Sequence, residues 1–308
     1  MQTAFISHPD CLRHETGTGH PESAARLHAI EDRLIEVQLY YLLRHFDANE
    51  VTREQLLRVH DPAYLDALDA NPVTGGLHYL DPDTVVGPHS LRAARRAAGA
   101  VVTAVDRIMQ GEVNSAFCAV RPPGHHARRR QAMGFCIYNN IGVGVAHALS
   151  AHGLQRVAVL DFDVHHGNGT EEIFADDPRV MICSTFQHPF YPDFPFEENG
   201  SRILCAPLPA GAGGTEFGAA VEQKFLPALE RFRPQMIFIS AGFDAHHDDD
   251  MAALNLTEAD YAWVTQVIMA VANRHADNRI VSSLEGGYEL RSLARSVEVH
   301  LRALMELH

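Results

Sequence analysis

The chain has 308 residues, a length that one large α/β domain can account for. Apolar residues make up 46% of it and charged residues 21%, which is ordinary for a soluble globular protein. The formal net charge of −14 argues against a nucleic-acid-binding surface, because phosphate binding needs clustered lysine and arginine.

The start of the chain lacks the basic and then apolar pattern of a signal peptide. Apolar runs stay well below the roughly 18 residues that a membrane span needs. Five cysteines are scattered without CxxC spacing, which is typical of reduced thiols inside a cell. We therefore expect a cytoplasmic protein with one domain over residues 1–308 and without a nucleic-acid or membrane partner.

Short apolar runs alternate with longer amphipathic segments along the chain. Strands are expected at residues 3–7, 116–120, 156–163, 179–184, 236–243 and 279–284. Helices are expected at residues 91–110, 139–152, 215–232 and 257–275, the last beginning at the N-cap residue Thr257. Continuous apolar strands joined by helices predict an α/β fold with a parallel sheet covered on both faces.

Polar motifs begin where four of the apolar runs stop. They read RPPGHH at 121–126, DFDVHHG at 161–167, GFDAH at 242–246 and EGGY at 285–288. In parallel sheets, reactive groups collect in the loops beyond the carboxyl ends of the strands. We expect these four motifs to meet in one crevice, with the long loops 71–90 and 187–202 as its rim.

The motif at 161–167 has the composition of a metal site. In an extended strand, residues two apart project to one side, so Asp161, Asp163 and His165 would share a face. Carboxylate oxygen and imidazole nitrogen suit Zn²⁺, and Asp244 as a third ligand leaves room for water and substrate. The alternative is that these polar groups only cap the helix that follows.

Adjacent histidines and a tyrosine lie in two other motifs. His125 and His126 follow a segment whose prolines restrict the backbone, and beside a metal-bound water they could divide the tasks of general base and electrostatic stabiliser. The hydroxyl of Tyr288, placed after two glycines, could donate to a developing oxyanion. Taken singly, a histidine pair is usually a surface accident, and such a turn is often only a turn.

Together and in this order, the motifs resemble those of the histone deacetylase and acetylpolyamine amidohydrolase family, in its class II-like bacterial branch. The matching stretches are RPPGHHA (121–127), GFCIYNN (134–140), LDFDVHHGNGT (160–170), SAGFDAH (240–246) and LEGGY (284–288). The resemblance extends from about residue 20 to about residue 300. It implies one deacetylase domain with the arginase-deacetylase fold, built on a parallel sheet of about eight strands.

The resemblance also implies roles for single residues. Its zinc ligands match Asp163, His165 and Asp244, and its catalytic groups match His125, His126, Asp161, Asn168 and Tyr288. Its substrate tunnel matches Gly134, Phe135 and Tyr191, with Met251 and the rim acid Asp83 as further candidates. A structural monovalent cation, K⁺, would be held by Asp161, Asp163, His165 and Ser184.

Two positions depart from patterns in the family. Asn168 stands where many members carry aspartate as the partner of the second histidine. The loss of that charge should leave His126 less basic, because a nearby carboxylate stabilises imidazolium. Met251 stands at about the place where polyamine deacetylases carry a gatekeeper glutamate, and Asp250 is one residue away.

The expected function is zinc-dependent hydrolysis of an acyl amide on a lysine side chain of a protein or peptide. The alternative is an acetylpolyamine or other small-molecule amidohydrolase, and a non-catalytic binding module would require eroded ligands. A two-manganese hydrolase would need further carboxylates that bridge a second metal. The expected partner is an acylated amine, and a homo-oligomer is left open.

Overall fold

The structure, a computed structural model, describes residues 2–196 and 202–307. Its centre is an eight-stranded sheet in which every neighbouring pair is parallel. In spatial order the strands are β2 (Arg44–Asp47), β1 (Thr3–Ser7), β5 (Ser115–Cys118), β10 (Ile280–Leu284), β9 (Met236–Ala241), β6 (Val157–Asp161), β7 (Val180–Gln187) and β8 (Ile203–Leu208). The expected α/β fold with about eight parallel strands is confirmed.

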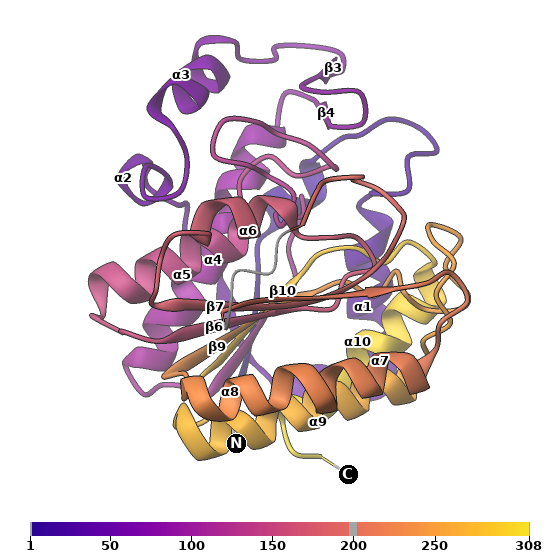
Figure 1. Ribbon diagram of the computed structural model, residues 1–308. Helices are drawn as coiled ribbons and strands as arrows, with labels where there is room; N and C mark the ends of the chain where they lie inside the picture. The colour runs from indigo at the N-terminus through magenta and orange to yellow at the C-terminus, as the bar shows by residue number, and fades with distance from the viewer. Residues whose placement is uncertain (1, 197–201, 308) are drawn as a thin grey trace.

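Helices cover both faces of this sheet, as Figure 1 shows. On one side lie α4 (Ser90–Met109), α5 (Asn140–Ala151) and α6 (Asn168–Phe174); on the other lie α8 (Leu226–Phe232), α9 (Glu258–His275) and α10 (Leu290–Leu304). The chain also forms α1 (Ala25–Glu36), which packs on α10, and α7 (Gly214–Ala220), which leads into α8. Smaller elements are α2 (Arg53–Leu56), α3 (Pro62–Ala70) and the hairpin of β3 (His78–Tyr79) and β4 (Val85–Val86). Within the described residues, no helix has both the length and the apolarity that a membrane crossing requires.

The elements that the sequence predicted lie close to where it placed them, but α1, α6 and α10 were not among the expected helices. All six expected strands form, and α9 has the expected N-cap residue Thr257, whose backbone N–H donates to the Asp260 carboxylate (2.8 Å). The two edge strands, β2 and β8, were not among the expected strands. β2 is polar and mostly exposed, whereas β8 is apolar but contains Pro207, and a proline within an apolar run argues against a strand in the middle of a sheet. The helix expected at 215–232 is divided by a π-helical turn at Val221–Phe225.

One geometric expectation was wrong. The strand expected to reach residue 163 ends at Asp161, so Asp163 and His165 do not belong to one extended face with it. Instead, the backbone N–H of Asp163 donates to Asp161 (3.1 Å), and that of His165 donates to Asp163 (2.9 Å). These side-chain-to-backbone bonds fold the segment into successive tight turns, and the turns aim the side chains.

A fully buried charge network joins the N-terminal segment to the carboxyl end of the sheet. Glu22 pairs with Arg121 and, at 3.2 Å, with Arg26. Arg26 in turn donates to the carbonyl oxygens of Gly287 (2.6 Å) and Glu285 (2.5 Å), in the loop that follows β10. Burial alone would raise the pKa of Glu22, but the two guanidinium groups lower it to about 2. Glu22 therefore carries a charge that joins Arg121, which follows β5, to Arg26, and Arg26 holds the loop after β10.

Candidate active site

Three side chains converge at the carboxyl ends of β6 and β9. His165 Nδ1 lies 3.1 Å from Asp163 Oδ1 and 3.2 Å from Asp244 Oδ2, and all three residues are buried. Asp244 Oδ2 has no hydrogen-bond partner among the described residues. Two buried carboxylates and one imidazole with an unsatisfied oxygen form a setting that a cation would complete, and its oxygen and nitrogen donors suit zinc.

The pKa shifts of His165 and Asp244 indicate that the buried carboxylates favour a positive charge beside them. Burial alone would lower the pKa of His165, but the Asp163 and Asp244 carboxylates raise it to about 10. Burial, together with repulsion from Asp163, raises the pKa of Asp244 to about 6. The remaining carboxylate oxygens are held by backbone donors, with Val164 N–H on Asp244 Oδ1 (2.9 Å) and Gly286 N–H on Asp163 Oδ2 (2.8 Å). The loops are thus shaped around the carboxylates.

Two glycines permit this close approach. A Cβ atom at Gly286 would lie 2.1 Å from Asp244 Oδ2, so any side chain there would displace the carboxylate. Gly134 has a φ of +57°, and a Cβ at that position would lie 2.3 Å from the His126 ring. Both glycines are therefore needed for the geometry of the site, one at its floor and one at its wall.

The tandem histidines lie beside these residues with different partners. His125 Nδ1 is 2.9 Å from Asp161 Oδ2, and its Nε2 is 3.7 Å from Asp163 Oδ1. Burial would lower the pKa of His125, but the carboxylates of Asp163 and Asp161 raise it to about 10. An imidazole in this position is suited to carry positive charge next to a reacting oxygen.

His126 is held in the opposite state. Its Nδ1 lies 2.9 Å from Asn168 Oδ1, an atom that can only accept, so Nδ1 carries the proton and Nε2 keeps its lone pair. Burial, with repulsion from His125 and His165, holds the pKa of His126 well below its usual value. A neutral imidazole with a free Nε2 lone pair is the form that a general base requires.

A cavity of about 230 Å³ gives access to these groups. It is lined by Asp83, Pro123, His125, His126, Gly134, Phe135, His165, Phe190, Tyr191, Met251, Gly286 and Tyr288. The structure therefore brings together every tunnel residue expected from the sequence. Asp250 is absent from the lining, whereas Met251 is part of it. Part of the expected rim, residues 197–201, lies outside the described residues.

Asp249 and Glu285 are two site residues whose roles the sequence analysis missed. The Asp249 carboxylate turns inward and accepts from the backbone N–H groups of Tyr288 (2.6 Å) and Glu289 (3.0 Å), which places the tyrosine. Glu285 Oε2 accepts from the N–H groups of Gly124 (2.6 Å) and His125 (3.1 Å), which places the histidine pair. An acid at the end of an apolar strand was the available signal for Glu285, but a run of three acids does not show which one turns inward.

Comparison with known proteins identifies the class. A model of the histone deacetylase domain matches residues 20–304. A histone deacetylase-like amidohydrolase of Pseudomonas aeruginosa is 36% identical, over 93% of this chain and 82% of that protein. The human polyamine deacetylase HDAC10 is 33% identical, over 99% of this chain and 48% of that protein. The crystal structure of the HDA15 HD domain superimposes with a TM-score of 0.92 at 34% identity, covering 99% of this chain and 88% of that one.

An eight-stranded parallel sheet with a buried polar centre at its carboxyl edge is thus the arginase-deacetylase fold of a hydrolase. The chain belongs to the histone deacetylase family.

Replacing Asn168 by aspartate tests how the site sets the basicity of His126. The added carboxylate would stabilise the imidazolium, so the pKa of His126 should rise. Because the base must be unprotonated, we expect the acidic limb of the kcat/KM profile to move to higher pH, by roughly one unit or more. A profile that superimposes on that of the unmodified enzyme would rule out the contact as the control of basicity.

Replacing Asp249 by asparagine tests the placement of Tyr288. Loss of one charged acceptor should loosen the backbone of residues 288 and 289, and kcat should fall roughly 10- to 100-fold. Asp250→Asn is the matched control, since Asp250 is exposed and does not line the cavity. Equal kcat values for the two variants would contradict the role of Asp249.

Proposed function

We propose that this chain is a zinc-dependent deacetylase that hydrolyses an acyl amide on a lysine side chain. The observation that carries the proposal is the unsatisfied, buried Asp244 Oδ2, which faces His165 Nδ1 at the inner end of a cavity with aromatic walls. Asp163, His165 and Asp244 would hold the ion. A bound zinc ion lowers the pKa of a water molecule and polarises a carbonyl group.

The protein groups divide the remaining work. His126 Nε2 takes the proton of the attacking water and later returns it to the leaving amine. His125, held by Asp161, supplies positive charge beside the reacting centre. Tyr288 lines the same cavity, and burial raises the pKa of its hydroxyl well above the usual value, so the hydroxyl stays protonated and can donate to the developing oxyanion.

The cavity lining favours a lysine side chain over a polyamine. Phe135 and Tyr191 offer flat apolar walls to a methylene chain, and Met251 brings no charge that would select a second ammonium group. Asp83 is the carboxylate among the lining residues, and its Oδ1 already accepts from the Gly134 N–H (3.0 Å). An acetylpolyamine remains the second candidate, because a relative of similar sequence is named a polyamine deacetylase.

The proposal includes a structural K⁺ ion next to the zinc site. Asp161 and Ser184 are paired across β6 and β7, and the Ser184 hydroxyl is buried without a hydrogen-bond partner among the described residues. Together with Asp161, Asp163 and His165, which would contribute partly through backbone carbonyl oxygens, the Ser184 hydroxyl offers oxygen ligands of the type that a hard monovalent cation binds.

Replacing Tyr288 by phenylalanine tests the chemistry. Loss of one oxyanion donor should lower kcat on the order of 10²–10³-fold on an acetyl-lysine peptide, with one zinc ion per chain still bound. Metal content measured on the same sample separates loss of the hydroxyl from loss of the ion. Undiminished turnover, or full activity after complete removal of zinc, would refute the mechanism.

Replacing Met251 by glutamate tests the substrate preference. The new carboxylate would face the cavity and attract a second ammonium group, so the ratio of kcat/KM for an acetylated polyamine to that for an acetyl-lysine peptide should rise roughly tenfold. Asp250→Asn is the control that should leave the ratio unchanged. A preference for the polyamine in the unmodified enzyme would reverse the order of the two candidates.

A further inference from the structure

A second group of potential metal ligands lies away from the active site, between α4 and α5. Asp106 belongs to the last turn of α4, His147 to α5, and His152 directly follows α5. The Nε2 atoms of His147 and His152 each lie 2.8 Å from the same atom, Asp106 Oδ1. The two imidazole planes are nearly perpendicular, at 81°, so the two Nε2 atoms approach Oδ1 from different directions.

Both imidazoles contact the same oxygen atom, Asp106 Oδ1, so the three ligand atoms are gathered around one point. The three ligand atoms lie within 4.8 Å of one another, and two imidazoles with one carboxylate form a common zinc ligand set. His147 is buried, whereas the side chains of His152 and Asp106 are 22% and 38% exposed. An ion could therefore enter from solvent, and water could complete its coordination.

We propose that Asp106, His147 and His152 bind a second Zn²⁺ ion, independent of the ion proposed for the active site. The two sites lie at opposite ends of α5. The helix begins next to Asn139, whose side chain donates to the Ala127 carbonyl (3.1 Å) beside the histidine pair, and His152 stands at its other end, roughly 18 Å away for 12 residues. The ion would tie the end of α5 to α4.

The Arg58 guanidinium would compete with a metal ion for His147. Its Nη1 lies 3.3 Å from His147 Nδ1, and because guanidinium can only donate, this contact requires a lone pair on Nδ1 and the proton on Nε2. Zinc at Nε2 requires the other tautomer, with the proton on Nδ1. Metal binding and the Arg58 contact are therefore mutually exclusive.

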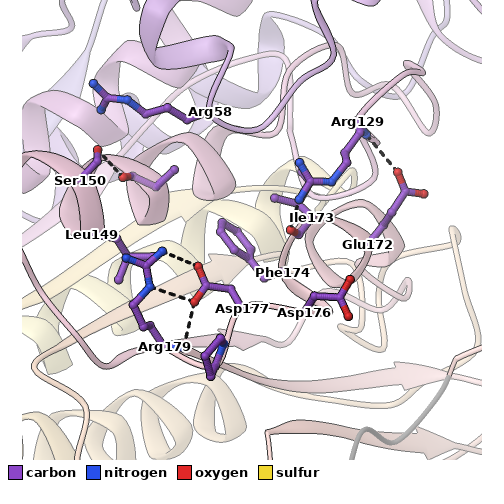
Figure 2. Close-up of a pocket in the computed structure, with 12 residues that line it drawn as sticks. Arg58, Arg129, Leu149, Ser150, Glu172, Ile173, Phe174, Asp176, Asp177 and Arg179 are labelled. Atoms are coloured by element: carbon purple, nitrogen blue, oxygen red, sulfur yellow. Dashed lines mark hydrogen bonds and ion pairs between the residues drawn. The ribbon is translucent and has the colours of Figure 1, made fainter.

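The surroundings of Arg58 allow its side chain to leave His147. Its other nitrogen, Nη2, lies 3.2 Å from the exposed Glu54 carboxylate. Figure 2 shows Arg58 at the edge of a cavity of about 560 Å³, with no dashed contact to the other residues drawn. Release of the guanidinium from His147 therefore requires no rearrangement of a packed core. The competition predicts that removing Arg58 strengthens zinc binding.

The test starts from enzyme that already holds one zinc ion per chain. Calorimetric titration with Zn²⁺ should reveal one further equivalent, and added zinc should raise Tm, because an ion that binds only the folded state stabilises it. His152→Ala and His147→Gln should weaken this second binding at least roughly 100-fold. Deacetylase activity at one equivalent of zinc should be unchanged in His152→Ala.

Arg58→Ala should tighten the second site by about 3- to 10-fold, the range expected for release of one competing hydrogen bond. Arg53→Ala is the matched control, since Arg53 comes from the same segment but pairs with Asp66 and, at 3.2 Å, with Asp69, not with His147. It should leave zinc affinity within about twofold, because exposed charges are screened.

Three outcomes would overturn the proposal. The first is that the unmodified enzyme binds no second equivalent of zinc, and the second is that His152→Ala binds it undiminished. The third is that crystals grown with excess zinc show anomalous zinc scattering away from residues 106, 147 and 152. An Arg58→Ala affinity equal to that of Arg53→Ala would overturn the competition. Because all readouts concern the second equivalent, failure here leaves the proposed deacetylase function untouched, and loss of that function leaves this site testable.

Discussion

Burial of several carboxylates at one edge of the sheet is the constraint on which the rest of the site depends. Asp161, Asp163, Asp244 and Glu285 are each at most 3% exposed, and a charge so far from water needs donors or a cation. The chain supplies donors from loop backbones, with N–H groups of residues 124, 125, 163, 164, 165 and 286 directed at these four side chains. The loop conformations are therefore a consequence of satisfying the carboxylates.

The same constraint separates the roles of the two adjacent histidines. His125 contacts a carboxylate and its pKa rises, whereas His126 contacts an amide oxygen and its pKa falls. Two residues that are neighbours in the chain are thereby set to opposite protonation states, His125 by the carboxylates of Asp163 and Asp161, and His126 by burial and by repulsion from His125 and His165. A pair of titratable groups held in different states is the arrangement that acid–base chemistry needs.

A further layer of contacts holds the loops themselves. Arg26 bonds the carbonyl oxygens of residues 285 and 287 and lies over the Tyr288 ring, 4.9 Å from its centroid. Asp249 holds the backbone of Tyr288 from the other side. The hydroxyl that would meet the substrate is therefore positioned by a helix near the start of the chain and by a loop after β9. Neither of these residues lines the cavity.

The sequence by itself determined the kinds of chemistry present and the type of fold. Apolar runs predicted the six inner strands, and the motifs beyond them identified the family, because both signals are carried by residues close together in the chain. The tertiary structure decided which acidic side chains contact which backbone groups and histidines. Asp249 and Glu285 act on backbone groups 39 to 161 positions away, and Asp106 meets His147 and His152 only because α4 packs on α5. Such contacts follow from sheet order and helix packing, which local periodicity does not encode. Asp163 and His165, by contrast, are only two residues apart, and side-chain-to-backbone bonds in tight turns bring them together in place of the strand alternation that their spacing predicted.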